Sequence, residues 1–248
     1  MIKFFRRIRQ TLVSEHKFSK YLLYAIGEIV LVVIGILIAL QINNWNEKQK
    51  TKNSELSYLK SIKNDLDADN ETISYIIGNT SKRIEAFESL KEQLRSFDTI
   101  SDSRKLYELA HNNRGFVDLQ LGDNTIETLK NRGNIELISS TPIRNGIQNY
   151  YDTAEIIYKS QDYMNGFIVN TALDTFFNVL ECEKGIEGNY KVPFDARARE
   201  NLPDVYNYVK RWLTNMNRQL QMLKRLGKKN RELVHLIASN YQLKERHD

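Results

Sequence analysis

Apolar residues fill one stretch near the start of the chain and recur at every third or fourth position through most of the remainder. The first stretch, residues 21–42, carries a single charge, Glu28. As a helix rising about 1.5 Å per residue it would reach roughly 33 Å, enough to cross the hydrocarbon core of a bilayer. Because no small-residue cleavage site follows, the pattern predicts a retained transmembrane helix rather than a cleaved signal peptide. The alternative is a buried core helix of a soluble protein.

A 3–4 spacing of apolar residues, typical of amphipathic helices, continues beyond this stretch. It predicts one helix over 44–97, with a kink at Gly78 and continuity with the transmembrane helix left open. Further helices are predicted over 103–112, 125–132, 142–181 and 203–244, with one clear loop over 183–202. The expected fold class is therefore all-α: an N-terminal transmembrane helix followed by an elongated antiparallel helical bundle with long coiled-coil-like helices.

Local sequence signals place the ends of these helices. Asp123 or Asn124 is expected to cap the helix over 125–132, and Gly133 is expected to end it. The hydroxyl-bearing residues before Pro142 form a strong helix start, and Pro203 is expected to begin the last helix.

Basic residues predict the orientation of the chain. The leader over 1–20 carries six Lys and Arg with one acid, which is the whole net charge of +5, and four Lys follow the apolar stretch closely. The positive-inside rule then places the N-terminus in the cytoplasm of a bacterium and the bundle over 43–248 in the extracytoplasmic or periplasmic space. The leader is expected to form a basic amphipathic helix on the lipid headgroups, or a disordered basic segment. The predicted anchors at the membrane interface are Arg6, Arg7, Arg9, Lys20 and Trp45.

Within the transmembrane helix, Glu28 is the residue that needs an explanation. At 100° per residue it shares a helix face with Gly35 and Ala39, which form a small-xxx-small pattern. One hypothesis makes this face a helix-association surface, with a protonated Glu28 bonding across it. The other has Glu28 reach toward the cytoplasmic headgroups, with the small residues incidental.

The charge within the bundle is uneven. Residues 205–248 hold 10 basic and 3 acidic residues, whereas residues 21–204 hold 20 basic and 27 acidic. We expect the basic last helix to be neutralised by its acidic neighbours. The cations between Lys224 and Arg231 would suit phosphates, but no recognition motif accompanies them, so the interpretation excludes nucleic acid as a partner.

Chemistry-bearing motifs are scarce in this sequence. The four histidines have no metal-binding spacing, the glycines form no phosphate loop, and Cys182 is the single cysteine. Asp65, Asp67 and Asp69 begin like a calcium loop, but its later positions do not match, so we interpret the triplet as a solvated helix face. The sequence therefore predicts no catalytic residues, no metal site and no cofactor, and it indicates that the protein is not an enzyme.

Two blocks carry a resemblance. The first is FFRRIRQTLVSEHKFSKYLLYAIGEIVLVVIGILIALQINNWNEKQK, and the second runs from Asn124 to Tyr151 and ends in a Tyr-Tyr pair. Together they resemble an uncharacterised bacterial domain-of-unknown-function family of single-pass membrane proteins, which share a basic FFR-type leader, a GEI…GILIALQ-type span and an NNWNE-type exit. The resemblance implies a membrane topology and no catalytic residues.

Two functions fit these observations. The first is a membrane-anchored interaction or scaffold protein, with the lipid bilayer, an unknown protein partner and a homo-oligomer through the span or the bundle as partners. The second is an extracytoplasmic sensory bundle that binds a ligand and signals through a partner protein.

Overall fold

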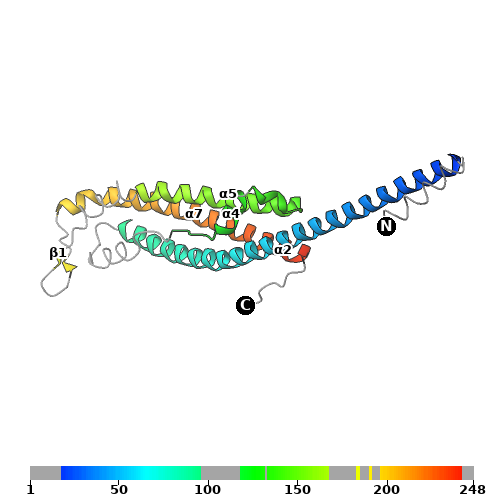
Figure 1. Cartoon of the computed structure of the whole chain (residues 1–248). Coiled ribbons are helices and arrows are strands. Elements are labelled where there is room, and N and C mark those ends of the chain that lie inside the picture. Colours follow the sequence, from blue (N-terminus) through cyan, green and yellow to red (C-terminus); the bar gives the residue numbers. More distant parts are fainter. Residues whose placement is uncertain are drawn as a thin grey trace. The chain divides into compact units, whose positions relative to one another are not determined.

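The computed structural model describes residues 18–95, 118–131, 133–167, 183–184, 190–191 and 196–241 (Figure 1). In chain order the elements are α2 (Phe18–Arg95), α4 (Asn124–Asn131), the 3-10 helix η2 (Asn134–Leu137), α5 (Thr141–Phe167), β1 (Glu183–Lys184), β2 (Tyr190–Lys191) and α7 (Ala196–Tyr241). Helices make up nearly all of these residues, which confirms the all-α fold class. The expected leader and the expected helix over 103–112 lie outside the described residues.

The chain divides into two compact units, residues 1–55 and residues 56–248. Helix α2 contributes to both, because it continues without a break from the apolar stretch through Gly78 to Arg95. The expected long helix is therefore confirmed, including its continuity with the apolar stretch. In the first unit, the described side chains from Asn43 to Ser54 are all exposed, in keeping with their polar composition.

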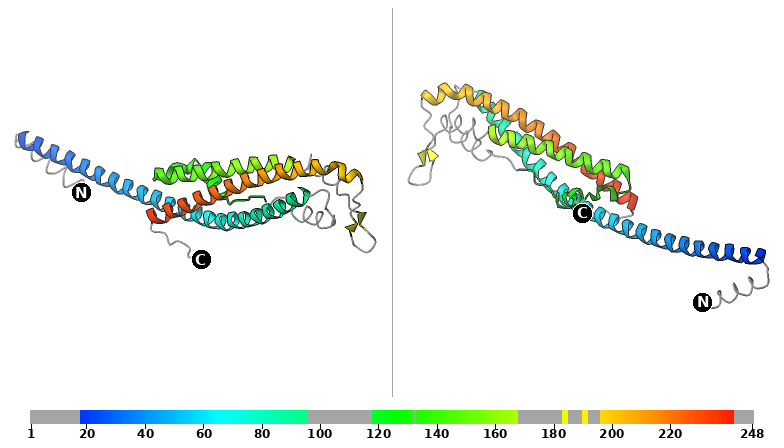
Figure 2. Two further views of the ribbon diagram at one scale, coloured as in Figure 1. Left: turned by 180° about the vertical axis from the view of Figure 1, so that it is seen from behind. Right: turned by 45° about the horizontal axis from the view of Figure 1, so that its top comes forward.

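The second unit is a bundle of three long helices, in which the later part of α2 lies beside α5 and α7 (Figures 1 and 2). The apolar residues that recur at three- and four-residue spacing along α2 form a buried seam, with exposed fractions of at most 3% for Leu59, Ile62, Leu66, Ile73, Ile76, Phe87, Leu90 and Leu94. One hydrophobic cluster joins the part of this seam from Leu59 to Ile76 to apolar residues of α5, α7, α4 and η2. Burial of this shared face is the main force that holds the three helices together.

Pair contacts give the direction of each helix. Going along α2 from Asp69 to Phe87, the neighbouring residue of α7 changes from Asn230 back to Trp212. Helix α7 also runs antiparallel to α5, as Figure 1 shows, and so α2 and α5 point the same way. Two parallel neighbours require a connection that returns along the bundle, and the described part of that connection begins at Asp118.

The ends of α4 follow the sequence signals. The N–H of Glu127 donates to the carbonyl of Asp123 (2.9 Å), so the first turn forms where a cap was expected. Beyond the helix, Gly133 adopts a left-handed conformation with φ of 65°, which a residue with a side chain adopts only at a cost. Helix α5 begins at Thr141, within the start that the hydroxyl-bearing residues before Pro142 indicate, and its continuation beyond Phe167 lies outside the described residues.

The expected loop over 183–202 is wrong at both ends. It contains a short antiparallel pairing, with Glu183 opposite Lys191 and Lys184 opposite Tyr190. Helix α7 then begins at Ala196, so Pro203 lies inside the helix rather than at its start. The residues before this proline are mostly Ala, Arg and Glu, which are strong helix formers, and only one backbone hydrogen bond is lost at Pro203.

Candidate functional site

A cluster of hydrogen-bonded polar side chains lies inside the apolar core of the bundle. Asp69 of α2 is 2% exposed, and Tyr150 of α5 and Asn230 of α7 are 0% exposed. The hydroxyl of Tyr150 donates to Oδ2 of Asp69 (2.8 Å). Nδ2 of Asn230 donates to the carbonyl of Leu66 (2.8 Å) and lies 3.4 Å from the hydroxyl of Tyr150. One polar cluster therefore joins all three long helices.

The interpretation of the aspartate triplet as a solvated face is wrong for Asp69. This residue occupies an inward position of the α2 seam, where its carboxylate also accepts the backbone N–H of Gly122 (2.8 Å). Its neighbour Asp67 pairs with Lys63 on the same helix (2.8 Å). Among the residues that the structure describes, no group of three or more His, Cys, Asp or Glu is placed to hold a metal ion. The cluster is therefore built to bond its own chain.

Burial governs the titration of this cluster. Desolvation raises the pKa of Asp69, although the hydrogen bonds from Gly122 and Tyr150 act in the opposite direction. Desolvation also raises the pKa of Tyr150 and of Tyr151, and the negative charge of Asp69 adds to both shifts. The tyrosine hydroxyls thus stay protonated and serve as hydrogen-bond donors.

Side chains of α5 hold the returning connection. Oε1 of Gln161 accepts the N–H of Leu119 (3.3 Å), and the hydroxyl of Tyr158 accepts the N–H of Leu121 (3.2 Å). The hydroxyl of Tyr151 donates to the carbonyl of Gly122 (3.1 Å). A buried backbone segment without regular secondary structure lacks the usual backbone hydrogen-bond partners, and these side chains supply them. The connection is therefore fixed to α5 by polar side chains and by its own buried Leu119.

In the part of the chain that the structure describes, three buried side-chain oxygens have no hydrogen-bond partner: Oδ2 of Asp65, Oδ1 of Asn70 and Oδ1 of Asn230. An unsatisfied buried acceptor costs about 1–3 kcal/mol.

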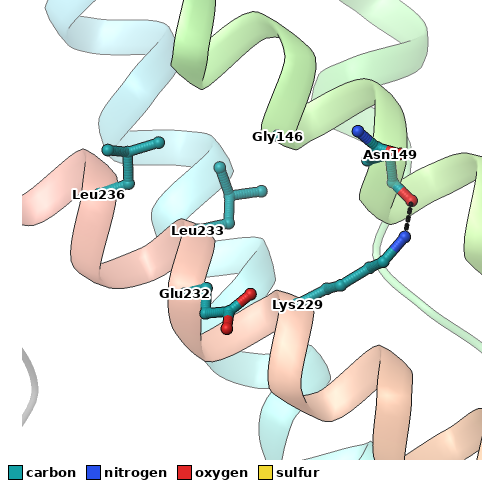
Figure 3. A pocket seen from close by; sticks show the side chains of 6 residues that line it. All are labelled: Gly146, Asn149, Lys229, Glu232, Leu233 and Leu236. Carbon is teal, nitrogen blue, oxygen red and sulfur yellow. Dashed lines mark hydrogen bonds between the residues drawn. The ribbon is translucent and has the colours of Figure 1, made fainter.

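A groove with a volume of about 360 Å³ lies between α5 and α7 (Figure 3). Its lining combines backbone and polar groups with two leucines and consists of Gly146, Asn149, Lys229, Glu232, Leu233 and Leu236. Nζ of Lys229 reaches across to α5, where it donates to Oγ1 of Thr153 (2.8 Å) and to the carbonyl of Asn149 (3.4 Å). The ammonium of Lys229 is thus already used to join the two helices.

Gly146 of α5 faces Leu233 of α7 in this groove. A side chain at this glycine would place its Cβ 2.9 Å from Cδ1 of Leu233. Leu233 itself is 3% exposed, so it has little room to move. The absence of a side chain at Gly146 therefore seats Leu233 against α5.

The predicted association face lies in the first unit. Glu28 is partly exposed and Ala39 is exposed. A Cβ built on Gly35 would meet no other atom within 4 Å. The structure therefore places the three residues on α2 without bringing another described segment against Gly35, and their role stays a prediction.

The predicted interface anchors are only partly described. Trp45 is 68% exposed and Lys20 lies in the first turn of α2. Arg6, Arg7 and Arg9 lie outside the described residues.

The apolar stretch of α2 is exposed along its length. By length and composition alone, this helix is apolar enough to cross a membrane: its most apolar window has a mean hydropathy of 2.6, and none of that window is buried. Among the described residues from Leu22 to Ile42, fourteen large aliphatic side chains are 46% to 78% exposed. A core helix of a soluble protein would bury such side chains.

The fold and the sites define an all-α protein that combines a helical bundle with a long exposed apolar helix segment. A family of unknown function, DUF6090, matches residues 28–186, and the chain belongs to this family. The expected membership in an uncharacterised family is thereby confirmed. No curated protein and no solved structure matches the chain.

The family match bears on the polar cluster. It includes Asp69, Gly122, Tyr150 and Tyr151, whereas Asn230 lies beyond its end. In the sequence, the Tyr-Tyr pair is part of a family resemblance, and no local pattern connects it to Asp69. The sequence signal that could have located the polar cluster was Asp69, an aspartate at an inward position among the apolar residues of the α2 seam.

Proposed function

We propose that the protein is a single-pass membrane-anchored interaction or scaffold module, in which residues 21–42 span a bacterial inner membrane. The N-terminus is cytoplasmic in this proposal, and the bundle is extracytoplasmic. The observation that carries the proposal is the exposed apolar stretch of α2.

The magnitude of this exposure supports a lipid environment. Burying one Val, Leu or Ile side chain contributes about 1.5–3 kcal/mol relative to leaving it in water. Fourteen such side chains are 46% to 78% exposed in this stretch. Scaled by these exposed fractions, their combined contribution is at least of the order of the 5–15 kcal/mol that typically separates a folded domain from its unfolded chain. The hydrocarbon core of a bilayer is the environment that covers a single helix on all sides.

A binding role rather than a catalytic one is supported by how the polar groups of the bundle are used. The buried acid, Asp69, receives two hydrogen bonds from its own chain. Lys229 bridges two helices, and the three bonded side chains of α5 hold the connection. These groups stabilise one arrangement of helices, which leaves the outer faces of the bundle as the surfaces on which partners would bind.

Membrane extraction and topology reporters test the proposal on the full chain. We expect the protein to stay in the membrane pellet at alkaline pH and to leave it only with detergent. A reporter that is active only outside the cytoplasm should be active when fused after Asp248, and its cytoplasmic counterpart should be inactive. Release by alkali, or the reverse reporter pattern, would contradict the anchoring or the orientation respectively.

A matched pair of variants locates the spanning segment. Leu31→Arg places a charge near the centre of residues 21–42, where insertion costs about 2.5–3.5 kcal/mol, and should lower the membrane-bound fraction. Trp45→Arg places the same charge beyond the predicted span and should leave most of the protein in the membrane. Equal behaviour of the two variants would show that the segment does not cross the bilayer.

A further inference from the structure

The outer face of α5 carries two exposed apolar side chains in line. Ile156 is 60% exposed and Tyr163 is 73% exposed, and a spacing of seven residues puts them on one stripe of the helix. Asn149, seven residues before Ile156, belongs to the same stripe and lines the groove of Figure 3. Asp152 and Lys159 lie within about 60° of this stripe and are exposed. The face is therefore apolar along its middle and charged beside it.

The outer face of α7 is basic. Lys224, Arg225 and Lys228 are exposed and lie within about 100° of one another around the helix. Lys228 pairs with Glu232 on its own helix at 3.7 Å, with side chains 72% and 64% exposed. Such an exposed pair contributes little and is readily exchanged for another partner. The long stems of these cations are apolar and suited to cover exposed apolar side chains.

The two faces are aligned in height. Lys229 of α7 contacts Thr153 of α5, and Asn230 lies beside Tyr150. Because α5 and α7 are antiparallel, the neighbouring residues Asp152 and Lys228 stand at about the same level. Four residues further along, Ile156 and Lys224 are level in the same way.

We propose that a second copy of this chain binds here, with the α5–α7 face of each copy packed on that of the other about a two-fold axis parallel to these helices. Rotation about such an axis does not change the position of a residue along the helix direction. Asp152 of one copy then meets Lys228 of its partner, and Ile156 meets the stem of Lys224. Each contact forms twice, as a two-fold interface requires.

Charge complementarity singles out a second copy as the partner. The outer face presents the exposed acid Asp152 and the apolar Ile156 on α5 and a basic stripe on α7, so at these positions it is complementary to itself after a two-fold rotation. This proposal rests on the proposed function in one respect: two copies anchored in one membrane share an orientation, which permits a parallel two-fold axis and excludes an inverted pairing. The groove beside Gly146 lies on the same face and would be covered by the partner.

Charge exchange tests the contact between Asp152 and Lys228 in full-length protein in native membranes. Asp152→Lys and Lys228→Asp each place like charges together and should lower the association constant about tenfold. Asp152→Lys combined with Lys228→Asp should restore association. The matched control is Lys82→Glu, an exposed residue of α2, which should have no effect.

Cysteine crosslinking tests the alignment between copies. In a Cys182→Ser background, a copy with Ile156→Cys and a differently tagged copy with Lys224→Cys should form a mixed disulfide-linked dimer. The control pair replaces Lys224→Cys with Tyr75→Cys on α2, which is 64% exposed but lies off the proposed face. This pair should not crosslink.

The outcomes separate this inference from the proposed function. Protein that stays in the membrane but fails to crosslink through the α5–α7 pair overturns the inference and leaves the anchoring intact. Crosslinks from Ile156→Cys to a different protein overturn it as well and identify a heterologous partner. Loss of the chain from the membrane fraction contradicts the proposed function instead. Helical content by circular dichroism confirms that each variant is folded.

Discussion

Replacement of Tyr150 by phenylalanine is the most direct test of the buried polar cluster. The change removes one oxygen atom and leaves the ring, so the packing of a side chain that is 0% exposed is kept. The carboxylate of Asp69 loses one of its two donors, at 2.8 Å, and keeps the N–H of Gly122. A hydrogen bond to a charged group contributes about 1.5–3 kcal/mol, and Asp69 has no solvent to replace it. We therefore expect Tyr150→Phe to lower the free energy of unfolding by about 2 kcal/mol.

The assay is chemical unfolding of the detergent-solubilised full chain, followed by circular dichroism at 222 nm. Tyr163→Phe is the matched control, because the same atom is removed from a side chain that is 73% exposed, and a change below about 0.5 kcal/mol is expected. A double-mutant cycle with Asp69→Asn measures the interaction itself, which should account for most of the loss. If Tyr150→Phe destabilises no more than Tyr163→Phe, the cluster does not hold the helices together as argued.

Three further predictions concern single residues. Burial raises the pKa of Asp69 above its ordinary value of 3.8, so the folded chain binds this proton more tightly than the unfolded chain. The free energy of unfolding should therefore fall as pH rises from about 4 toward the raised pKa. In a pH series of melting temperatures, Asp69→Asn should remove that part of the fall. Gly133→Ala should cost about 1 kcal/mol in chemical unfolding because φ is 65°, whereas Gly133→Asn should cost less. Leu90→Ala, at a side chain that is 0% exposed, should cost about 2–5 kcal/mol in the same assay, and a loss below 1 kcal/mol would mean that this part of α2 is not in the core.

The helices of the bundle were largely predictable because their signal is local. Apolar residues three or four apart identify the buried face of an amphipathic helix without knowledge of its partner. This reasoning identified the seam of α2, and it identified Ile143, Ile147 and Ile157 of α5, all of which are buried. It failed at Pro203, because a proline is favoured in the first turn of a helix but is tolerated inside one when strong helix formers precede it.

The polar cluster was not predictable in the same way. Asp69 reads as an interruption of the α2 seam, and an exposed aspartate and a buried one look alike in sequence. Its burial depends on donors from Tyr150 and Gly122, which are 81 and 53 residues away. Asn230 joins from a further helix, at a separation of 164 residues from the carbonyl that it binds. Residues so far apart are related only through the packing of the bundle.

The expectation that acidic neighbours neutralise the basic last helix also depends on the packing of the bundle. Two ion pairs of the described helices, Lys63 with Asp67 and Lys228 with Glu232, instead join residues four apart on one helix. Spacing along a helix sets such pairs, whereas the side of the bundle on which Lys224 and Arg225 lie depends on which face of α7 is buried.

By itself, the sequence determined the all-helical class, the long apolar stretch and the apolar face of each long helix, because composition and period are properties of a single segment. Only the tertiary structure decided that α2 and α5 run in the same direction, that Asp69 is a buried acceptor and that the α5 and α7 faces are level. Each of these depends on which segments come into contact. Hydrogen bonds and apolar contacts between residues far apart in the sequence form only when the whole bundle packs.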